Sequence, residues 1–252
     1  MKVAACSIVH YGSDYIGWAL RSVCEVVDLC HVVYTATPSH GHTTDAQPIE
    51  SRADILIAAG RFCRNVHFHE IKGATEEWQH RDAAIKICKG HGADLILVLD
   101  ADEVWHEDVL RSALVYAWEK NSARNWLINF VHLWRSFDTC CRDDAWPVRI
   151  IDLRHVNGVG YIPRELGEIY HFGYAVTDKV MNYKMLIHGH KDELRPDWFA
   201  TKWAAWPPVG DCHPTNGPKT DGSGWWDPEP FDKARLPAFM QEHPFWGRER
   251  VE

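Results

Sequence analysis

The 252-residue chain has no apolar run long enough to cross a membrane, and it has no excess of basic residues. A transmembrane helix needs about 20 consecutive, mostly apolar residues, so we expect no membrane-spanning segment. The net charge is -8, from 27 Lys and Arg against 35 Asp and Glu. Binding along nucleic acid needs clustered positive charge. A broad nucleic-acid footprint is therefore excluded, although a local basic groove is not.

Cysteine pairs at metal-binding or redox spacing are also missing. The chain has eight cysteines but no C-x-x-C pair. Disulfide scaffolds are typical of short secreted chains, and the start, MKVAACSIVHYGSDY, reads as a first strand rather than a signal peptide. We therefore predict a reducing, cytoplasmic location. Five cysteines fall inside apolar segments, as small buried hydrophobic residues do: Cys6, Cys24, Cys30, Cys63 and Cys88.

What the sequence does have is a regular alternation of strand and helix patterns. Strand patterns cover 3–9, 31–36, 65–71 and 94–99, and helical patterns cover 13–30, 48–60, 75–92 and 107–121. This alternation predicts βαβ units and a mostly parallel sheet flanked by helices. Ser13 would cap the first helix. Strand patterns at 125–134, 145–153 and 167–176 then follow without long helices between them, which predicts a mixed extension of the sheet before a helix near 178–188.

The fourth strand pattern, DLILVL, ends in three acids, Asp100, Asp102 and Glu103. Carboxylates this close repel one another and are costly to desolvate unless a positive group lies among them. Ligands of parallel α/β sheets bind beyond the carboxyl ends of the strands, and Mg²⁺ or Mn²⁺ prefers carboxylate oxygens and substrate phosphates. This position favours a metal site. The alternative is a solvated turn that caps the next helix.

Arg81 is a second indication of an anionic ligand. Trp78, Ile85 and Cys88 form an apolar stripe on their helix, and Arg81 falls on that stripe. An arginine on the buried face of a helix needs an anion. A nucleotide phosphate is one candidate, and a structural carboxylate is the other.

Histidines and tryptophans are abundant, at 16 and 13. Residues two apart share one face of a strand, a workable spacing for metal ligands, and three H-x-H pairs occur, at 40 and 42, 67 and 69, and 188 and 190. We interpret His67 and His69 as ordinary strand residues. The last pair, in IHGHKDE, would suit a metallohydrolase, but no third partner stands at a recognisable spacing. The late tryptophans either form a platform for sugars or bases or pack a long loop: Trp198, Trp203, Trp206, Trp225, Trp226 and Trp246.

Together these segments resemble a family 2-type glycosyltransferase with the GT-A fold. VAACSIVHYGSDYIGWALRSVCEVVD is similar to the family's opening strand, loop and helix, and RDAAIKICKGHGADLILVLDADE to its Arg-containing helix, strand and D-x-D. WPVRIIDLRH and EIYHFGYA are similar to segments of many bacterial members. The resemblance implies a GT-A (Rossmann-like) α/β fold and a metal-dependent, inverting transfer of sugar from a nucleotide-diphosphate sugar to a hydroxyl acceptor.

The resemblance also implies roles for segments and residues. Residues 1–105 would bind the nucleotide sugar, 106–195 would form the acceptor and catalytic half of the same domain, and 196–252 a Trp-, Pro- and Gly-rich extension. Asp102 and His171 would bind Mn²⁺ or Mg²⁺. An acidic residue would take the proton of the acceptor hydroxyl. Four acids are placed for this, Asp143, Asp144, Glu165 and Glu168, and we favour Glu165, followed by Asp144. The donor would contact the residues His10, Tyr11, Arg81, Asp100 and Ala101.

Two other functions stay open. A nucleotidyltransferase also pairs a Rossmann-like sheet with acidic metal ligands, but it usually carries a basic Gly-rich loop after the first strand, and HYGSDYIGW has neither Lys nor Arg. A non-catalytic carbohydrate- or nucleic-acid-binding protein on the same fold would keep the aromatic surface but would not need the acidic strand end. The acceptor itself stays open among glycan, lipid, protein, small molecule and modified DNA, the last disfavoured by the negative charge.

Overall fold

The computed structural model describes residues 1–38, 44–46, 48–142, 146–187, 189, 191–208, 210–215 and 227–252. Its helices are α1 (Ile16–Val23), α2 (Arg52–Ala59), α3 (Glu77–Gly90), α4 (Glu107–Lys120) and α5 (Asp178–Ile187), with short helical turns η1 (Arg164–Leu166), η2 (Lys191–Glu193), η3 (Phe199–Trp203), η4 (Lys233–Arg235) and η5 (Ala238–Glu242). Its strands are β1 (Val3–Val9), β2 (Leu29–Thr35), β3 (Val66–Ile71), β4 (Leu95–Val98), β5 (Glu103–Val104), β6 (Asn125–Leu127), β7 (Phe130–Trp134), β8 (Thr139–Cys141), β9 (Val148–Asp152), β10 (Val159–Tyr161), β11 (Ile169–Tyr174) and β12 (Glu229–Pro230).

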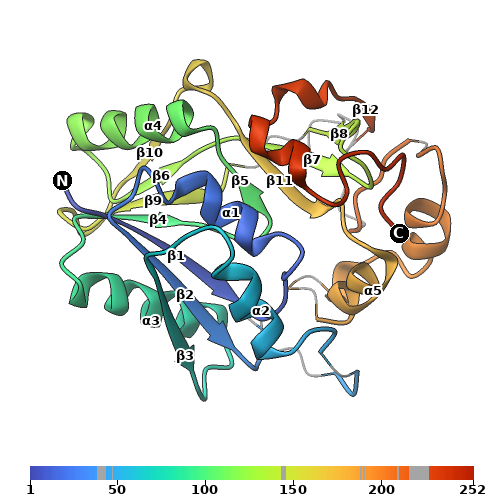
Figure 1. The fold of residues 1–252 in the computed structure, drawn as a ribbon, viewed down its shortest axis with the longest axis horizontal. Coiled ribbons are helices and arrows are strands. Elements are labelled where there is room, and N and C mark those ends of the chain that lie inside the picture. The colour runs from blue at the N-terminus through green and yellow to red at the C-terminus, as the bar shows by residue number, and fades with distance from the viewer. Residues whose placement is uncertain are drawn as a thin grey trace.

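The main sheet has seven strands in the order β10-β6-β9-β4-β1-β2-β3 (Figure 1). The four strands β4, β1, β2 and β3 are parallel, and β9 runs antiparallel to β4 and β6. The chain moves outward from β1 to β3 and then returns to place β4 on the other side of β1. The carboxyl ends of β1 and β4 therefore flank a topological switch point, where α/β sheets bind their ligands. The predicted α/β class with a mostly parallel sheet is confirmed.

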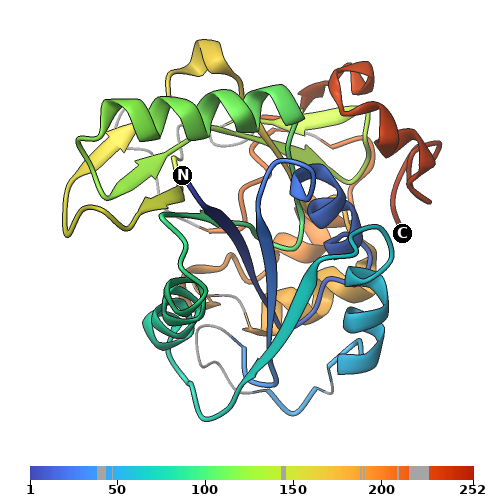
Figure 2. The ribbon, with the colours of Figure 1, turned by 60° about the vertical axis from the view of Figure 1, so that its left-hand side comes forward.

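Helices cover both faces of this sheet (Figure 2). Successive residues of a strand point to opposite faces: Val3 and Ala5 pack with α1, α2 and α4, whereas Ala4 and Cys6 pack with α3. This is why the strand patterns are apolar at consecutive positions rather than alternating. The helices on the two faces thus position the strand ends at the switch point.

The predicted mixed extension of the sheet is only partly right. β6, β9 and β10 do extend the main sheet, but β7, β8 and β11 form a second sheet in the order β12-β8-β7-β11-β5. The predicted strand 125–134 divides into β6, which pairs with β9, and β7, which pairs with β11. Apolar residues predominate on both sides of Asn129, so the pattern does not reveal that the chain changes partners between residues 127 and 130.

The C-terminal segment packs against the N-terminal half. β12 joins the second sheet, and Trp198 and Trp203 are buried in one cluster with Tyr15 and Trp18 of the N-terminal loop and α1. Burial of this kind excludes Trp198 and Trp203 from a ligand platform. Trp206 and Trp246 are half-buried, and residues 225 and 226 lie outside the described residues.

The first helix is shorter than the predicted 13–30, and Ser13 does not cap it. The residue before α1 is Tyr15, whose side chain makes no capping hydrogen bond. The N–H groups of Gly12 and Ser13 instead donate to the Glu50 carboxylate, at 2.9 and 2.8 Å. α2 carries the reciprocal cap between Ser51 and Asp54. All eight cysteines are free, and within the described ranges no helix combines the length and apolarity required to span a membrane.

Candidate functional site

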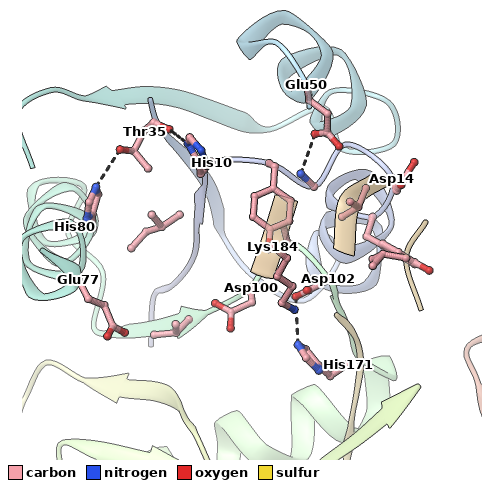
Figure 3. Close-up of a pocket in the computed structure, with 18 of the residues that line it drawn as sticks. His10, Asp14, Thr35, Glu50, Glu77, His80, Asp100, Asp102, His171 and Lys184 are labelled. Carbon is pink, nitrogen blue, oxygen red and sulfur yellow. Dashed lines mark hydrogen bonds and ion pairs between the residues drawn. The ribbon is translucent and has the colours of Figure 1, made fainter. Parts of the chain in front are cut away.

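A cavity of about 290 Å³ opens at the carboxyl ends of β1, β2 and β4 (Figure 3). It lies at the switch point and is near the lower end of the volumes of small-molecule sites, about 300 Å³. Glu165 does not line it, and Asp144 lies outside the described residues. Seven predicted site residues do line the cavity: His10, Tyr11, Arg81, Asp100, Ala101, Asp102 and His171.

The acidic end of β4 is neutralised from within by Arg149 of β9. The Arg149 Nη2 lies 2.6 Å from an oxygen of Asp100, and its Nε lies 2.8 Å from an oxygen of Glu103. Burial raises the pKa of Glu103, and the Arg149 guanidinium opposes that rise by pairing with the carboxylate. Burial also lowers the pKa of Arg149, but the Asp100 and Glu103 carboxylates outweigh it and raise that pKa. Of the three acids, only Asp102 is left without this arginine as a partner.

Asp102 and His171 both line the cavity and face each other there. The Oδ1 of Asp102 lies 3.7 Å from the Nε2 of His171, because β5 and β11 pair antiparallel and the Phe172 N–H donates to the Asp102 carbonyl at 2.7 Å. A Cβ on Gly173 would lie 2.5 Å from the His171 ring and 2.8 Å from the Asp102 carboxylate. Only glycine at 173 allows the two side chains to approach each other.

His171 is held in the form that binds a metal. Burial lowers its pKa well below the usual histidine value, and His132 and Lys184 lower it further, so the imidazole is neutral. Its Nδ1 lies 2.8 Å from the Nδ1 of His132, and this hydrogen bond orients the ring with Nε2 toward Asp102. Asp102 and His171 thus fit a Mn²⁺ or Mg²⁺ ion that takes its other ligands from water and phosphate. Among the described residues the cavity offers no three-ligand group within 4.8 Å.

Lys184 of α5 brings a positive charge to the same place. Its Nζ donates to the Gly173 carbonyl at 2.9 Å and lies 4.6 Å from the centre of the Tyr174 ring. Burial lowers the pKa of Lys184, against the pull of Asp102 and Asp100. Figure 3 shows the side chain ending beside Asp102, opposite His171. The sequence carries no signal for this lysine, because it lies in a helix without a motif.

His10 is fixed at the end of β1 by two hydrogen bonds. Its Nδ1 lies 2.9 Å from the Thr35 carbonyl, and its Nε2 lies 2.7 Å from the Tyr183 hydroxyl. Burial lowers its pKa, so the ring is neutral and shapes the wall without a free nitrogen. The Thr35 hydroxyl in turn lies 3.0 Å from the Nε2 of His80. The sequence patterns do not single out His80, although it directly precedes Arg81.

Close packing against Gly12 explains why a small residue, Ala101, lies between the two aspartates. Gly12, in the loop after β1, has a φ of 130°, and a Cβ on it would lie 3.0 Å from the Ala101 Cβ. The two loops at the switch point are therefore in van der Waals contact. A larger residue at position 101 or 12 would push the β1 loop away from the aspartates.

The prediction that Arg81 lies on a buried stripe is wrong. Trp78 is 67% exposed, and Arg81 is 46% exposed and forms an ion pair with Glu77 one turn earlier. The residues of α3 that pack on the sheet are His80, Ala84 and Cys88, so the buried face is rotated from the predicted one. Arg81 still reaches the cavity rim. An exposed pair of this kind is weak, so its guanidinium can turn to a phosphate at little cost.

The remaining acids of the region have different surroundings. Asp14 lines the cavity, and burial, with the Glu50 charge, raises its pKa above the usual aspartate value, while Arg248 opposes the rise. It follows the first strand, so the rule that pointed to Asp100 would have found it. Glu165 is exposed in η1. Glu168 is bound in ion pairs with Arg142 and Arg235.

The fold and the cavity together define an α/β architecture with a mostly parallel sheet, and the D-x-D segment lies at the end of the fourth strand and at the edge of the cavity. No family model matches the chain, and no curated protein sequence does.

Several solved structures are similar to the chain. TarS 1–349 from S. aureus matches 74% of this chain and 64% of its own, with 15% identity and a TM-score of 0.43. The same protein in complex with UDP-GlcNAc matches 53% and 35%, with 19% identity and a TM-score of 0.36. Mannose-1-phosphate geranyltransferase from Thermus thermophilus matches 60% and 50%, with 12% identity and a TM-score of 0.34. The chain thus spans less than two thirds of the TarS chains. These similarities are too distant to carry a functional argument, and the α/β class rests on the sheet order and helix layers.

Proposed function

We propose that the chain is a metal-dependent glycosyltransferase that moves a sugar from a nucleotide-diphosphate sugar to a hydroxyl acceptor, with inversion at the anomeric carbon. The observation that carries this proposal is the facing pair of Asp102 and His171 at the switch-point cavity, with Arg149 holding Asp100 beside them. A diphosphate leaving group needs a cation at the point where its charge develops. The cavity is lined by two side chains that can bind a metal, Asp102 and His171, and by two cationic side chains, Lys184 and Arg81.

Seven of the residues that line the cavity have a role in this proposal. Mn²⁺ or Mg²⁺ held by Asp102 and His171 would neutralise the diphosphate. Lys184 and Arg81, at the cavity rim, would contact phosphate oxygens. Asp100, whose orientation Arg149 fixes, would accept a hydrogen bond from the ribose. The donor's base and ribose would pack against the rings His10 and Tyr11.

The first test is nucleotide-dependent stabilisation of the intact chain. We expect one sugar nucleotide in a panel to raise the melting temperature with Mn²⁺ or Mg²⁺ present, and much less with a chelator, because a ligand at 100 times its Kd stabilises by about 2.7 kcal/mol. Turnover should release the nucleoside diphosphate. Release of pyrophosphate would instead identify a nucleotidyltransferase, and no stabilisation by any sugar nucleotide would end the proposal.

A mutation can separate the contribution of Lys184 to diphosphate binding from the contribution of the metal. We expect Lys184→Met to weaken binding of the nucleoside diphosphate at least tenfold, both with Mn²⁺ and with a chelator, because its ammonium acts without a metal. Isothermal titration with UDP, GDP, ADP, CDP and TDP measures this. Lys179→Met, on the same helix, is the control and should change nothing. Unchanged affinity in Lys184→Met would remove Lys184 from the donor site.

The catalytic base stays a prediction, and the two candidates can be compared directly. Glu165→Gln is expected to leave the transfer rate within about twofold, because Glu165 is exposed and does not line the cavity. Asp144→Asn is expected to lower the rate about 10²–10⁴-fold with unchanged donor affinity, as loss of a general base does. Initial rates and donor titrations of both variants check this. A large rate loss in Glu165→Gln alone would restore Glu165 as the base.

The acceptor class stays open, and the cytoplasmic location stays a prediction. Eight free cysteines are consistent with a reducing compartment. The proposal of inversion rests on the resemblance to family 2-type enzymes, in which one base and a single displacement would transfer the sugar. The anomeric configuration of the product, read by NMR, tests it.

A further inference from the structure

Four histidines gather at the edge of the main sheet, away from the cavity. His31 lies on β2, His67 and His69 lie on β3, and His91 caps the end of α3. His31 and His67 are direct partners in the parallel ladder, and His69 shares a strand face with His67. The His31 ring centre lies 4.7 Å from that of His91 and 5.4 Å from that of His67. Ring nitrogens of His31, His69 and His91 all lie within 4.8 Å of one another.

This cluster is separate from the proposed donor site. β2 runs from His31 toward Thr35, which lines the cavity, and four strand residues span about 13 Å. None of the four histidines lines the cavity. The cluster lies at the amino ends of the strands, under the last turn of α3, whereas the cavity lies at their carboxyl ends.

His31 has a buried nitrogen without a partner. The residue is fully buried, and its Nδ1 lies 3.1 Å from the Nε2 of His69. Its Nε2 is enclosed by protein and makes no hydrogen bond within the described part of the chain. Buried polar atoms are almost always paired. An unpaired imidazole nitrogen among three other imidazoles is the arrangement that a bound metal ion would satisfy.

The spacing and the charge of the cluster also suit a metal. Two nitrogens bound to one tetrahedral Zn²⁺ at about 2.0–2.1 Å lie about 3.3 Å apart, and the ring nitrogens of His31, His69 and His91, all within 4.8 Å of one another, come within about 1.5 Å of that spacing. Burial and the neighbouring imidazoles lower the pKa of His31 to about 4 and also lower that of His69, so both rings are neutral. The carboxyl end of α3, where His91 lies, favours a positive charge. Lys2 contacts this end through the His91 carbonyl, at 2.7 Å.

We propose that His31, His69 and His91, with His67 as the fourth ligand, form a binding site for a transition-metal dication, Zn²⁺ foremost. Imidazole ligands suit Zn²⁺, Ni²⁺ and Cu²⁺, whereas Mg²⁺ and Mn²⁺ prefer oxygen. A site made only of imidazoles therefore selects different metals from the cavity, where His171 is joined by the Asp102 carboxylate and by oxygens of the ligand. β3 is the last strand of the sheet. A metal here ties that edge strand to β2 and to the end of α3. The site does not depend on the proposed transferase activity.

The test uses the full chain without a histidine tag, stripped of metal with a chelator. We expect titration with ZnCl₂ to show one site per chain of micromolar affinity or tighter, and a rise in melting temperature that MgCl₂ at the same concentration does not give. His91→Gln should weaken this binding at least tenfold. His91 is exposed, so the variant should fold even where His31→Gln does not.

Two controls separate this site from other metal binding. His155→Gln alters a histidine outside the cluster, bonded to Asn121, and should bind zinc as the wild type does. Asp102→Asn alters the cavity and should also keep the zinc site. The proposal fails if the wild type takes up no stoichiometric zinc, or if His91→Gln and His155→Gln bind it equally.

Discussion

Arg149→Met is expected to lower the free energy of unfolding by about 3–5 kcal/mol, the cost of removing one partner from a buried ion pair. The change leaves Glu103 fully buried and Asp100 beside it, with their shared counter-charge gone. Methionine approximately fills the volume of the arginine stem, so the loss reports charge rather than a cavity. Urea unfolding monitored by tryptophan fluorescence measures it.

Two further variants show whether the unpaired buried charge causes the loss in the free energy of unfolding. Arg111→Met removes an exposed pair with Glu107 one turn earlier in α4, and should cost no more than about 1 kcal/mol. The double variant Arg149→Met with Glu103→Gln should be more stable than Arg149→Met alone, because the uncompensated carboxylate is then neutral. Equal losses in the Arg149 and Arg111 variants would mean that the acids at the end of β4 are solvated and need no partner.

Asp102→Asn is expected to lower the transfer rate about 10²–10³-fold, the scale seen when one group that stabilises developing charge is removed. The amide keeps the size of the carboxylate but is a poor ligand for Mn²⁺ or Mg²⁺. Since Asp102 is at a strand end and partly exposed, the melting temperature without metal should stay within a few degrees of the wild type. Initial rates against Mn²⁺ concentration measure the effect.

The decisive measurement is how strongly a chelator changes donor binding in each variant. In Asp102→Asn, a chelator should have little further effect on donor binding, whereas in Lys184→Met it should still weaken binding. Asp82→Asn, which removes an exposed carboxylate paired with Lys86 on α3, is the matched control and should keep full activity. Wild-type turnover by Asp102→Asn would show that the D-x-D segment does not hold the metal.

Much of the framework follows from short-range patterns. β1 has the predicted bounds, and β2, β3 and β4 end within two residues of the predicted strands, because apolar runs bounded by turns are local signals. The gathering of His10, Asp100 and Asp102 at one cavity also follows from the sequence. Parallel strands joined by helices bring their carboxyl ends to one edge of the sheet, so residues that follow different strands meet there.

Sequence patterns mislead where the outcome depends on how a helix is rotated about its axis or on which strands pair. The apolar stripe predicts Arg81 on the buried face of α3, but the helix packs through His80 and Ala84, and Trp78 at the helix start points to solvent. One exposed tryptophan is enough to shift the predicted face. The division of 125–134 into β6 and β7 likewise depends on which strands lie alongside, and these come from later in the chain.

The sequence by itself determined the α/β class, the order of the first strands and helices, and the acidic end of β4 at the ligand-binding edge. Tertiary structure alone decided what surrounds those acids. Arg149 comes from an antiparallel strand 46 or more residues later, and Lys184 from α5, which follows β11. The facing of His31 and His69 depends on strand register. Such contacts join residues distant in the chain, and no local periodicity encodes which distant side chains will face one another.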